Sequence, residues 1–254
     1  MATFLDDYSK MSIVQPLKHK SDVPAAAKHI ITFMEKQAGQ ELLVLRSDNG
    51  AEYLNRKVGG FLKNKGVLHQ TSNPYTPEQN GAAERLNRTL MERVRAMLED
   101  SGLPKSYWAE AVCSAAYIRN RSPAAGRAKT PWELFFGKTP DVSNMRTFGA
   151  EAYALVPKQL RQKLDNHSQL GRFVGYSKGQ KGYRIALPSG KVISCGDVVF
   201  VEDITEQAQQ PEEEAQDTVE IDLDEPGKAS DDSEREDDDS GPGSQGVERD
   251  AHHV

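Results

Sequence analysis

Apolar and polar positions follow two different patterns along the chain. Up to about residue 125, apolar residues recur at helical spacing or gather in short runs, which predicts helices alternating with strands. The clearest helix is predicted over 82–99, with one apolar stripe facing the core. That stripe consists of Ala83, Leu86, Leu90, Val94 and Met97. We therefore predict an α/β fold for this part of the chain.

The remaining elements of this region are bounded by Gly, Pro, Asn and Ser, which typically end helices and strands. Ser21 is placed to cap a helix that ends at Gly39. Strands are predicted at 2–7, 12–17, 42–45 and 67–71, and further helices over 55–65, over 106–121 and directly after Thr130. The run Leu42–Leu45 is apolar throughout, which predicts a buried strand.

From residue 148 the pattern changes to short alternating strands. They are predicted at 150–156, 171–176, 182–187 and 191–201. So many strands in so short a segment predict a small β-barrel. Basic residues make its surface positive, which suits a DNA backbone or another protomer, or is an ordinary solvated surface. They are Lys158, Arg161, Lys163, Arg172, Lys178, Lys181 and Arg184.

Charge divides the chain into a basic body and an acidic tail. The formal net charge of −6 combines −15 for residues 206–254 with +9 for residues 1–205. We expect the tail to be a disordered linker, with competition for the basic body as the alternative. Two cysteines are too few for a zinc site or a disulfide framework, so we expect no zinc and a nuclear or cytoplasmic location, not secretion. The absence of a long apolar run excludes a membrane-spanning segment in this sequence.

Two acids are candidates for metal-dependent chemistry. Asp48 follows the apolar run 42–45, and Glu84 opens the helix predicted over 82–99. Two carboxylates that converge with an open face suit Mg²⁺ in phosphoryl transfer. The alternative is that both are ordinary surface acids.

The polar side of that helix predicts a DNA contact. Glu84 lies in line with Asn80, Asn87, Arg88, Met91 and Arg95, at spacings of three, four and seven residues. Amides and guanidinium groups beside a carboxylate suit a metal-bound phosphodiester with its backbone alongside. The alternative is a solvated face with a weak Glu84–Arg88 ion pair.

Several short words around these residues resemble the integrase core of copia-type LTR retrotransposons. They are Ser47-Asp48-Asn49-Gly50, Pro74-Tyr75-Thr76-Pro77, Gln79-Asn80-Gly81 and Glu84-Arg85-Leu86-Asn87-Arg88-Thr89-Leu90. Later words resemble the SH3-like module that follows this core: Phe148-Gly149, Gly175-Tyr176, Lys181-Gly182-Tyr183 and Asp197-Val198-Val199-Phe200. The resemblance extends over residues 3 to about 203.

The resemblance implies a ribonuclease-H-like core in which Asp48 and Glu84 are the second and third members of a catalytic acidic triad. It further implies Mg²⁺ or Mn²⁺ as cofactor, double-stranded DNA as partner, association with a second copy of the chain, and cutting and joining of DNA ends. We expect neither a membrane nor a small-molecule substrate.

In the family the first catalytic Asp lies on the strand before the words Phe4-Leu5-Asp6-Asp7-Tyr8-Ser9-Lys10. We therefore expect a core without its first strand and with impaired catalysis. Asp6 and Asp7 fit a turn better than a replacement for that acid.

These inferences predict four segments. Residues 1–125 form the partial integrase core, 126–147 a connecting segment with a short helix, 148–203 the SH3-like barrel, and 204–254 the acidic tail. A truncated integrase is the favoured function. A non-catalytic DNA-binding or architectural protein and a non-functional relic of a retroelement polyprotein are the alternatives.

Overall fold

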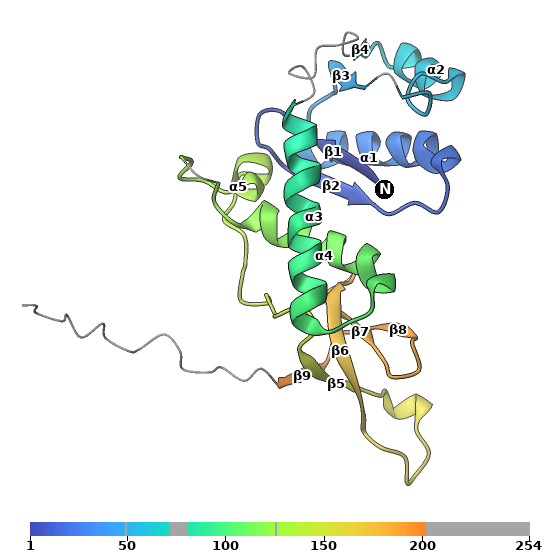
Figure 1. Cartoon of the computed structure of the whole chain (residues 1–254), viewed down its shortest axis with the longest axis vertical. Coiled ribbons are helices and arrows are strands. Elements are labelled where there is room, and N and C mark those ends of the chain that lie inside the picture. The colour runs from blue at the N-terminus through green and yellow to red at the C-terminus, as the bar shows by residue number, and fades with distance from the viewer. Residues whose placement is uncertain (49, 72–80, 125, 202–254) are drawn as a thin grey trace, which may run out of the picture. The chain divides into compact units, whose positions relative to one another are not determined.

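The computed structural model describes residues 1–48, 50–71, 81–124 and 126–201. These residues lie in one compact unit. Figure 1 shows helix α3 (Gly81–Ser101) running along this unit, from the strands of the N-terminal part to a five-stranded sheet. Within the described part of the chain, no helix is long and apolar enough to span a membrane.

Four strands of the N-terminal part form two separate pairs. β1 (Ala2–Leu5) is antiparallel to β2 (Ser12–Gln15). β3 (Val44–Ser47) is parallel to β4 (Leu68–Thr71). Among the described residues, no strand hydrogen-bonds to both pairs, so they are two separate two-stranded sheets.

Helix α1 (Val23–Ala38) contributes to the apolar clusters of both pairs. Ala27 and Ile30 are buried with residues of β1, whereas Ile31 joins a cluster beneath β3 and β4. The helix ends at Gly39, whose φ of 66° is left-handed, as predicted. The predicted cap is wrong: Ser21 lies inside a 3₁₀ turn, η1 (Lys20–Asp22), and α1 starts at Val23 without a side-chain cap.

The buried strand predicted at 42–45 is also wrong in part. β3 begins only at Val44, and Leu43 and Val44 are 76% and 43% exposed. Helices α1 and α2 (Arg56–Asn64) contribute to the cluster that covers Leu42 and Leu45. A continuous apolar run does not distinguish a strand covered on one face from a strand covered on both.

Helix α4 (Trp108–Arg121) is central to the packing. It follows the 3₁₀ turn η3 (Lys105–Tyr107) and joins β2 through Asn120, which is 4% exposed. The Asn120 amide accepts from the Ser12 amide and hydroxyl at 3.0 and 2.9 Å and donates to the Ser12 carbonyl at 2.7 Å. Because each of these buried polar groups is paired, α4 is fixed in register against β2.

The short helix α5 (Pro131–Phe136) follows the predicted cap, Thr130, which forms a capping box with Glu133. Trp132 of α5 lies against Phe136 and against the Arg121 guanidinium, 3.9 Å from the ring centre. Trp132 is therefore a packing residue that joins α5 to the end of α4.

The C-terminal strands form an antiparallel sheet in the order β8-β7-β6-β5-β9. Its strands are β5 (Glu151–Leu155), β6 (Ser168–Tyr176), β7 (Tyr183–Ala186), β8 (Val192–Cys195) and β9 (Val198–Val201), with a 3₁₀ turn, η4 (Lys158–Leu160), after β5. One face covers a core in which Phe173, 1% exposed, meets three other aromatic rings.

The sheet shares a hydrophobic cluster with α3 and α4. Val174 and Ala186 of the sheet are buried together with Leu90 and Val94 of α3 and Val112 of α4. We call the facing residues of α3, α4 and the sheet the seam. Polar contacts stabilise it. Glu110 accepts two hydrogen bonds from the Arg184 guanidinium, at 2.5 and 2.7 Å.

Candidate nucleic-acid interface

Asp48 lies directly after the C-terminal end of β3, as predicted, and its side chain is exposed. Its Oδ1 accepts a hydrogen bond from the Gly50 amide at 3.2 Å. The buried Ser47 hydroxyl donates to the Asp48 carbonyl at 2.9 Å and lies 2.9 Å from Nε2 of His69. Because a hydroxyl has one proton, His69 donates from Nε2 in this arrangement. The backbone that presents Asp48 is thus held by the neighbouring strand β4.

The electrostatic surroundings of Asp48 are acidic. The pKa of the Tyr53 hydroxyl is raised by burial, and further by the negative charges of Asp48 and Glu52. Glu52 thus adds a second negative charge near this end of β3.

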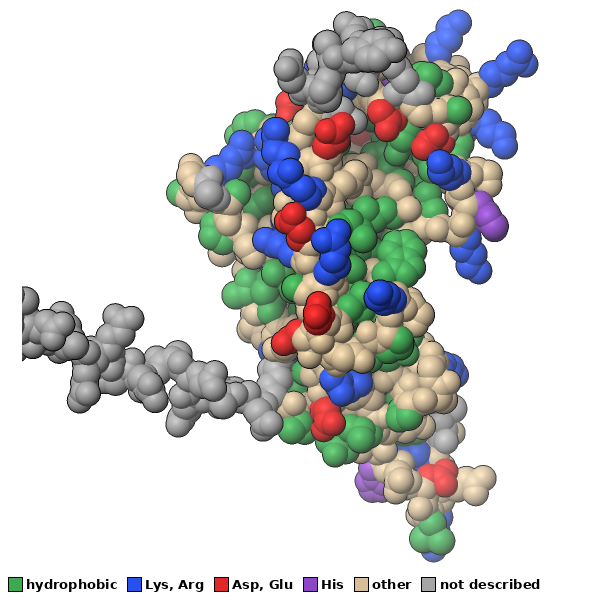
Figure 2. Space-filling view, viewed as in Figure 1, with side chains coloured by type: hydrophobic (Ala, Val, Ile, Leu, Met, Phe, Trp, Pro, Cys, Tyr) green, Lys and Arg blue, Asp and Glu red, His purple; other side chains and the backbone are tan. Residues whose placement is uncertain are grey.

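Glu84 lies in the first turns of α3 and is exposed. The predicted stripe of this helix is confirmed at Leu86, Leu90 and Val94, which are at most 4% exposed. Arg88 and Arg95 are exposed, as the periodicity predicts. Figure 2 shows Lys and Arg side chains gathered along α3, with acids between them. This helix therefore presents guanidinium groups to solvent together with the carboxylates of Glu84, Glu92, Glu99 and Asp100.

Two amides were predicted on the same face. Asn87 instead lies at the boundary between α3 and β1, partly buried, where its Oδ1 accepts from the Thr3 hydroxyl at 2.9 Å. Its amide oxygen is thereby used to hold α3 on β1. Asn80 lies outside the described residues.

Asp6 and Asp7 have separate roles in the turn that follows β1. Asp6 Oδ2 accepts from the amide and the hydroxyl of Ser9, at 2.8 and 2.6 Å. Asp7 pairs with Lys10 at 2.5 Å, and its side chain is 96% exposed. The structure thus supports a turn rather than a replacement ligand.

The carboxylates present fit a divalent cation only in part. Asp48 and Glu84 each offer hard oxygens that suit Mg²⁺. However, within the described residues no group of three or more His, Cys, Asp or Glu side chains could hold a metal ion. The described chain therefore supplies at most two carboxylates for such a site.

Two basic residues of the sheet do not form the free surface predicted for them. Arg184 is paired with Glu110, which raises the pKa of its guanidinium. Arg172 donates to the carbonyls of Gly149 and Ser101, the latter at 3.0 Å. Both guanidinium groups join the sheet to the helices, so they are not free for a DNA backbone.

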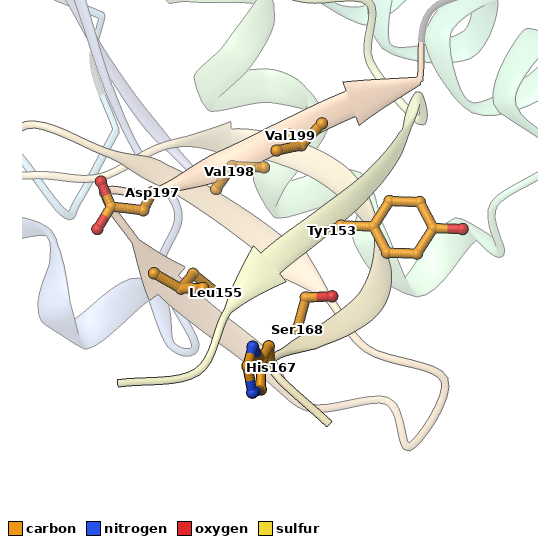
Figure 3. A pocket seen from close by; sticks show the side chains of 8 residues that line it. Tyr153, Leu155, His167, Ser168, Asp197, Val198 and Val199 are labelled. Atoms are coloured by element: carbon orange, nitrogen blue, oxygen red, sulfur yellow. The ribbon is translucent and has the colours of Figure 1, made fainter. Parts of the chain in front are cut away.

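A shallow hollow of about 520 Å³ lies on the outer face of the five-stranded sheet. Figure 3 shows Tyr153 and Leu155 of β5 beside His167 and Ser168, with the β9 residues Val198 and Val199 opposite. The register places Tyr153 between Leu170 and Val199. Because these three side chains are 40%, 43% and 69% exposed, they form an exposed apolar patch.

Family models match two parts of this chain. The model described as integrase core domain matches residues 1–77, which include Asp48, and the model described as retroviral polymerase SH3-like domain matches residues 150–214. The fold is accordingly an α/β integrase core followed by an SH3-like β domain, which confirms the predicted class.

Similar sequences occur in retrotransposon polyproteins. The chain is 42% identical over 202 residues to the retrovirus-related Pol polyprotein from transposon TNT 1-94 of Nicotiana tabacum, covering 79% of this chain and 15% of that protein. It is 31% identical over 201 residues to the Pol polyprotein from transposon RE2 of Arabidopsis thaliana, covering 78% and 14%. The chain is thus a segment with the integrase core and SH3-like domains of copia-type retrotransposon Pol polyproteins, and spans about a seventh of these two relatives.

Two solved structures align with this chain at lower similarity. The HTLV-2 integrase catalytic core domain in complex with magnesium aligns with a TM-score of 0.42 and 20% identity, covering 52% of this chain and 82% of that chain. A simian T-cell lymphotropic virus intasome in complex with PP2A regulatory subunit B56 gamma aligns with a TM-score of 0.43 and 18% identity, covering 76% and 68%.

Proposed function

We propose that this chain serves DNA integration by holding double-stranded DNA along α3, with little or no joining activity of its own. The observation that carries the proposal is the exposed side of α3. There Arg88 and Arg95 face solvent, while the opposite side of the helix is buried in the core. Guanidinium groups form strong charge-assisted hydrogen bonds with phosphate oxygens, and such contacts position a duplex without reading its sequence.

The proposed limit on activity follows from the carboxylates. Cutting and joining of DNA needs cations that are held between the attacking and leaving oxygens. Asp48 and Glu84 are the side chains that would hold a Mg²⁺ or Mn²⁺ ion, and Mg²⁺ requires near-ideal octahedral geometry. Two exposed carboxylates fix the position of such an ion poorly, so we derive no chemical step through it.

A strand-transfer assay tests this limit. Pre-processed donor DNA is incubated with target DNA and Mg²⁺ or Mn²⁺, with the wild-type chain or with Glu84→Gln. We expect no joined product above the level of the variant. Metal-dependent joining that disappears in Glu84→Gln would show instead that the chain is an active integrase.

We also propose that the exposed apolar patch around Tyr153, Leu170 and Val199 binds a second copy of the chain. Burial of exposed apolar side chains favours association, and two copies can share the same sheet face in a symmetric dimer. Sedimentation velocity should show a concentration-dependent dimer that is lost in Val199→Lys. The control is Val142→Lys, because Val142 is 51% exposed outside the patch. Equal sedimentation of wild type and Val199→Lys would exclude this surface.

A further inference from the structure

A basic hollow lies between the turn after β1, the first turns of α3, and α4. Its volume is about 230 Å³, nearly eight times the ~30 Å³ that one water molecule takes up in the liquid. It is lined by Leu5, Lys10, Ala82, Arg85, Leu86, Thr89 and Arg119. Three of these side chains are cationic and none is acidic.

Arg119 is the most firmly held of the three cations. Its guanidinium donates to the Lys10 carbonyl at 2.8 Å and to the Ser12 hydroxyl at 3.3 Å. Burial lowers the pKa of Arg119, and the positive charge of Arg93 lowers it further. Among the described residues no carboxylate pairs with it. Arg119 is thus a partly buried charge with no counter-ion in the described chain, which is unfavourable unless an anion is supplied.

Lys10 is presented by a rigid turn. It has a φ of 61°, whereas every other described residue with positive φ is a glycine. Its amide donates to the Asp6 carbonyl at 2.9 Å, and the turn is closed by the hydrogen bonds from Ser9 to the Asp6 carboxylate. Backbone strain of this kind occurs most often at ligand-binding sites. The ammonium group pairs with Asp7, but a pair with so exposed a carboxylate contributes little and exchanges readily.

Arg85 completes the set from α3. It is exposed, and its guanidinium lies back over Gly81 at the start of the helix. Arg85 and Arg88 are three residues apart, so they are neighbours on the helix surface. A chain of phosphates that contacts Arg88 therefore passes close to the hollow.

We propose that this hollow binds one phosphate group of the DNA backbone, held by Lys10, Arg85 and Arg119. The inference rests on the DNA binding proposed above and extends it to a site outside the Glu84 face. A phosphate fits better than a peptide carboxylate because its several oxygens can accept from three converging cations at once. The hollow would fix the position of the duplex relative to α3.

The experiment combines two probes on the full chain. Salt titration of duplex binding compares wild type with the double variant Lys10→Gln/Arg85→Gln. The control is Lys105→Gln/Lys138→Gln. Both control lysines are exposed; Lys105 lies beyond the C-terminal end of α3 and Lys138 follows α5. Loss of one phosphate contact should reduce the slope of log K against log salt by about 0.9 in the pocket variant, and leave the control unchanged. An unchanged slope in the pocket variant would overturn the proposal.

The second probe separates this site from the proposed function. In NMR spectra of the Arg side chains, inorganic phosphate should shift the Nε–H signal of Arg119, and acetate at equal ionic strength should not. Absence of a phosphate shift would reject the pocket even if DNA binds. Equal shifts with acetate would instead indicate a carboxylate-bearing partner and also overturn the proposal. If inorganic phosphate shifts the Arg119 signal and duplex DNA does not bind, the hollow is an anion site, but its assignment to the DNA backbone fails together with the proposed function.

Discussion

Gly149→Ala should lower the free energy of unfolding by about 3 kcal/mol. Gly149 lies at the seam with φ of 86°, and a Cβ there would meet Ser101 of α3 closer than 3.0 Å. The left-handed backbone costs an alanine about 1 kcal/mol, and forcing an extra methyl into a packed seam costs about 1–3 kcal/mol more.

The matched control is Gly137→Ala. Gly137 has a similar φ of 70°, but nothing lies within 4 Å of its Cβ position, so only the backbone cost of about 1 kcal/mol should appear. Urea unfolding of both variants measures the difference. The Ser101→Gly background should recover most of the additional loss, because it removes the atoms that clash. Equal losses at Gly149 and Gly137 would mean that the sheet does not pack closely on α3 in solution.

Arg88→Glu/Arg95→Glu should weaken binding to duplex DNA by about 100-fold. Each substitution removes a charge-assisted hydrogen bond worth at least about 1.5 kcal/mol, and 1.4 kcal/mol corresponds to a tenfold change in affinity. The control Lys105→Glu/Lys138→Glu changes net charge equally at other exposed positions. Fluorescence anisotropy of a labelled duplex measures both. A loss of the same size in the control would assign the effect to net charge and not to α3.

The periodicity of the sequence was sufficient to predict most helices. The α3 stripe is confirmed because Leu86, Leu90 and Val94 recur at the spacing of one helix face. Most strands were located to within a few residues, but the single strand predicted at 191–201 is two strands, β8 and β9, at opposite edges of the sheet. The burial of the strands was not predictable. Leu43 is exposed because nothing in its own sequence shows that only one face of β3 is covered.

The two acids of the candidate site were predictable from the sequence, whereas the basic hollow beside it was not. Asp48 and Glu84 lie at a strand end and on a helix, as motif and pattern together predicted. Lys10, Arg85 and Arg119 were not predicted as a group, because they come from three distant elements. Their only shared signal in the sequence is positive charge. In the same way, the sequence predicts Arg184 as part of a basic surface, because its partner Glu110 lies on another element and only the structure shows the pair.

The most direct test of DNA holding along α3 is a salt titration of duplex binding by the wild-type chain in EDTA. Two duplexes of unrelated sequence are compared between about 50 and about 200 mM salt. We predict similar affinities for both duplexes and a linear fall of log K with log salt, without any divalent cation. No binding at the lowest salt, or binding that appears only when Mg²⁺ is added, would contradict the proposal.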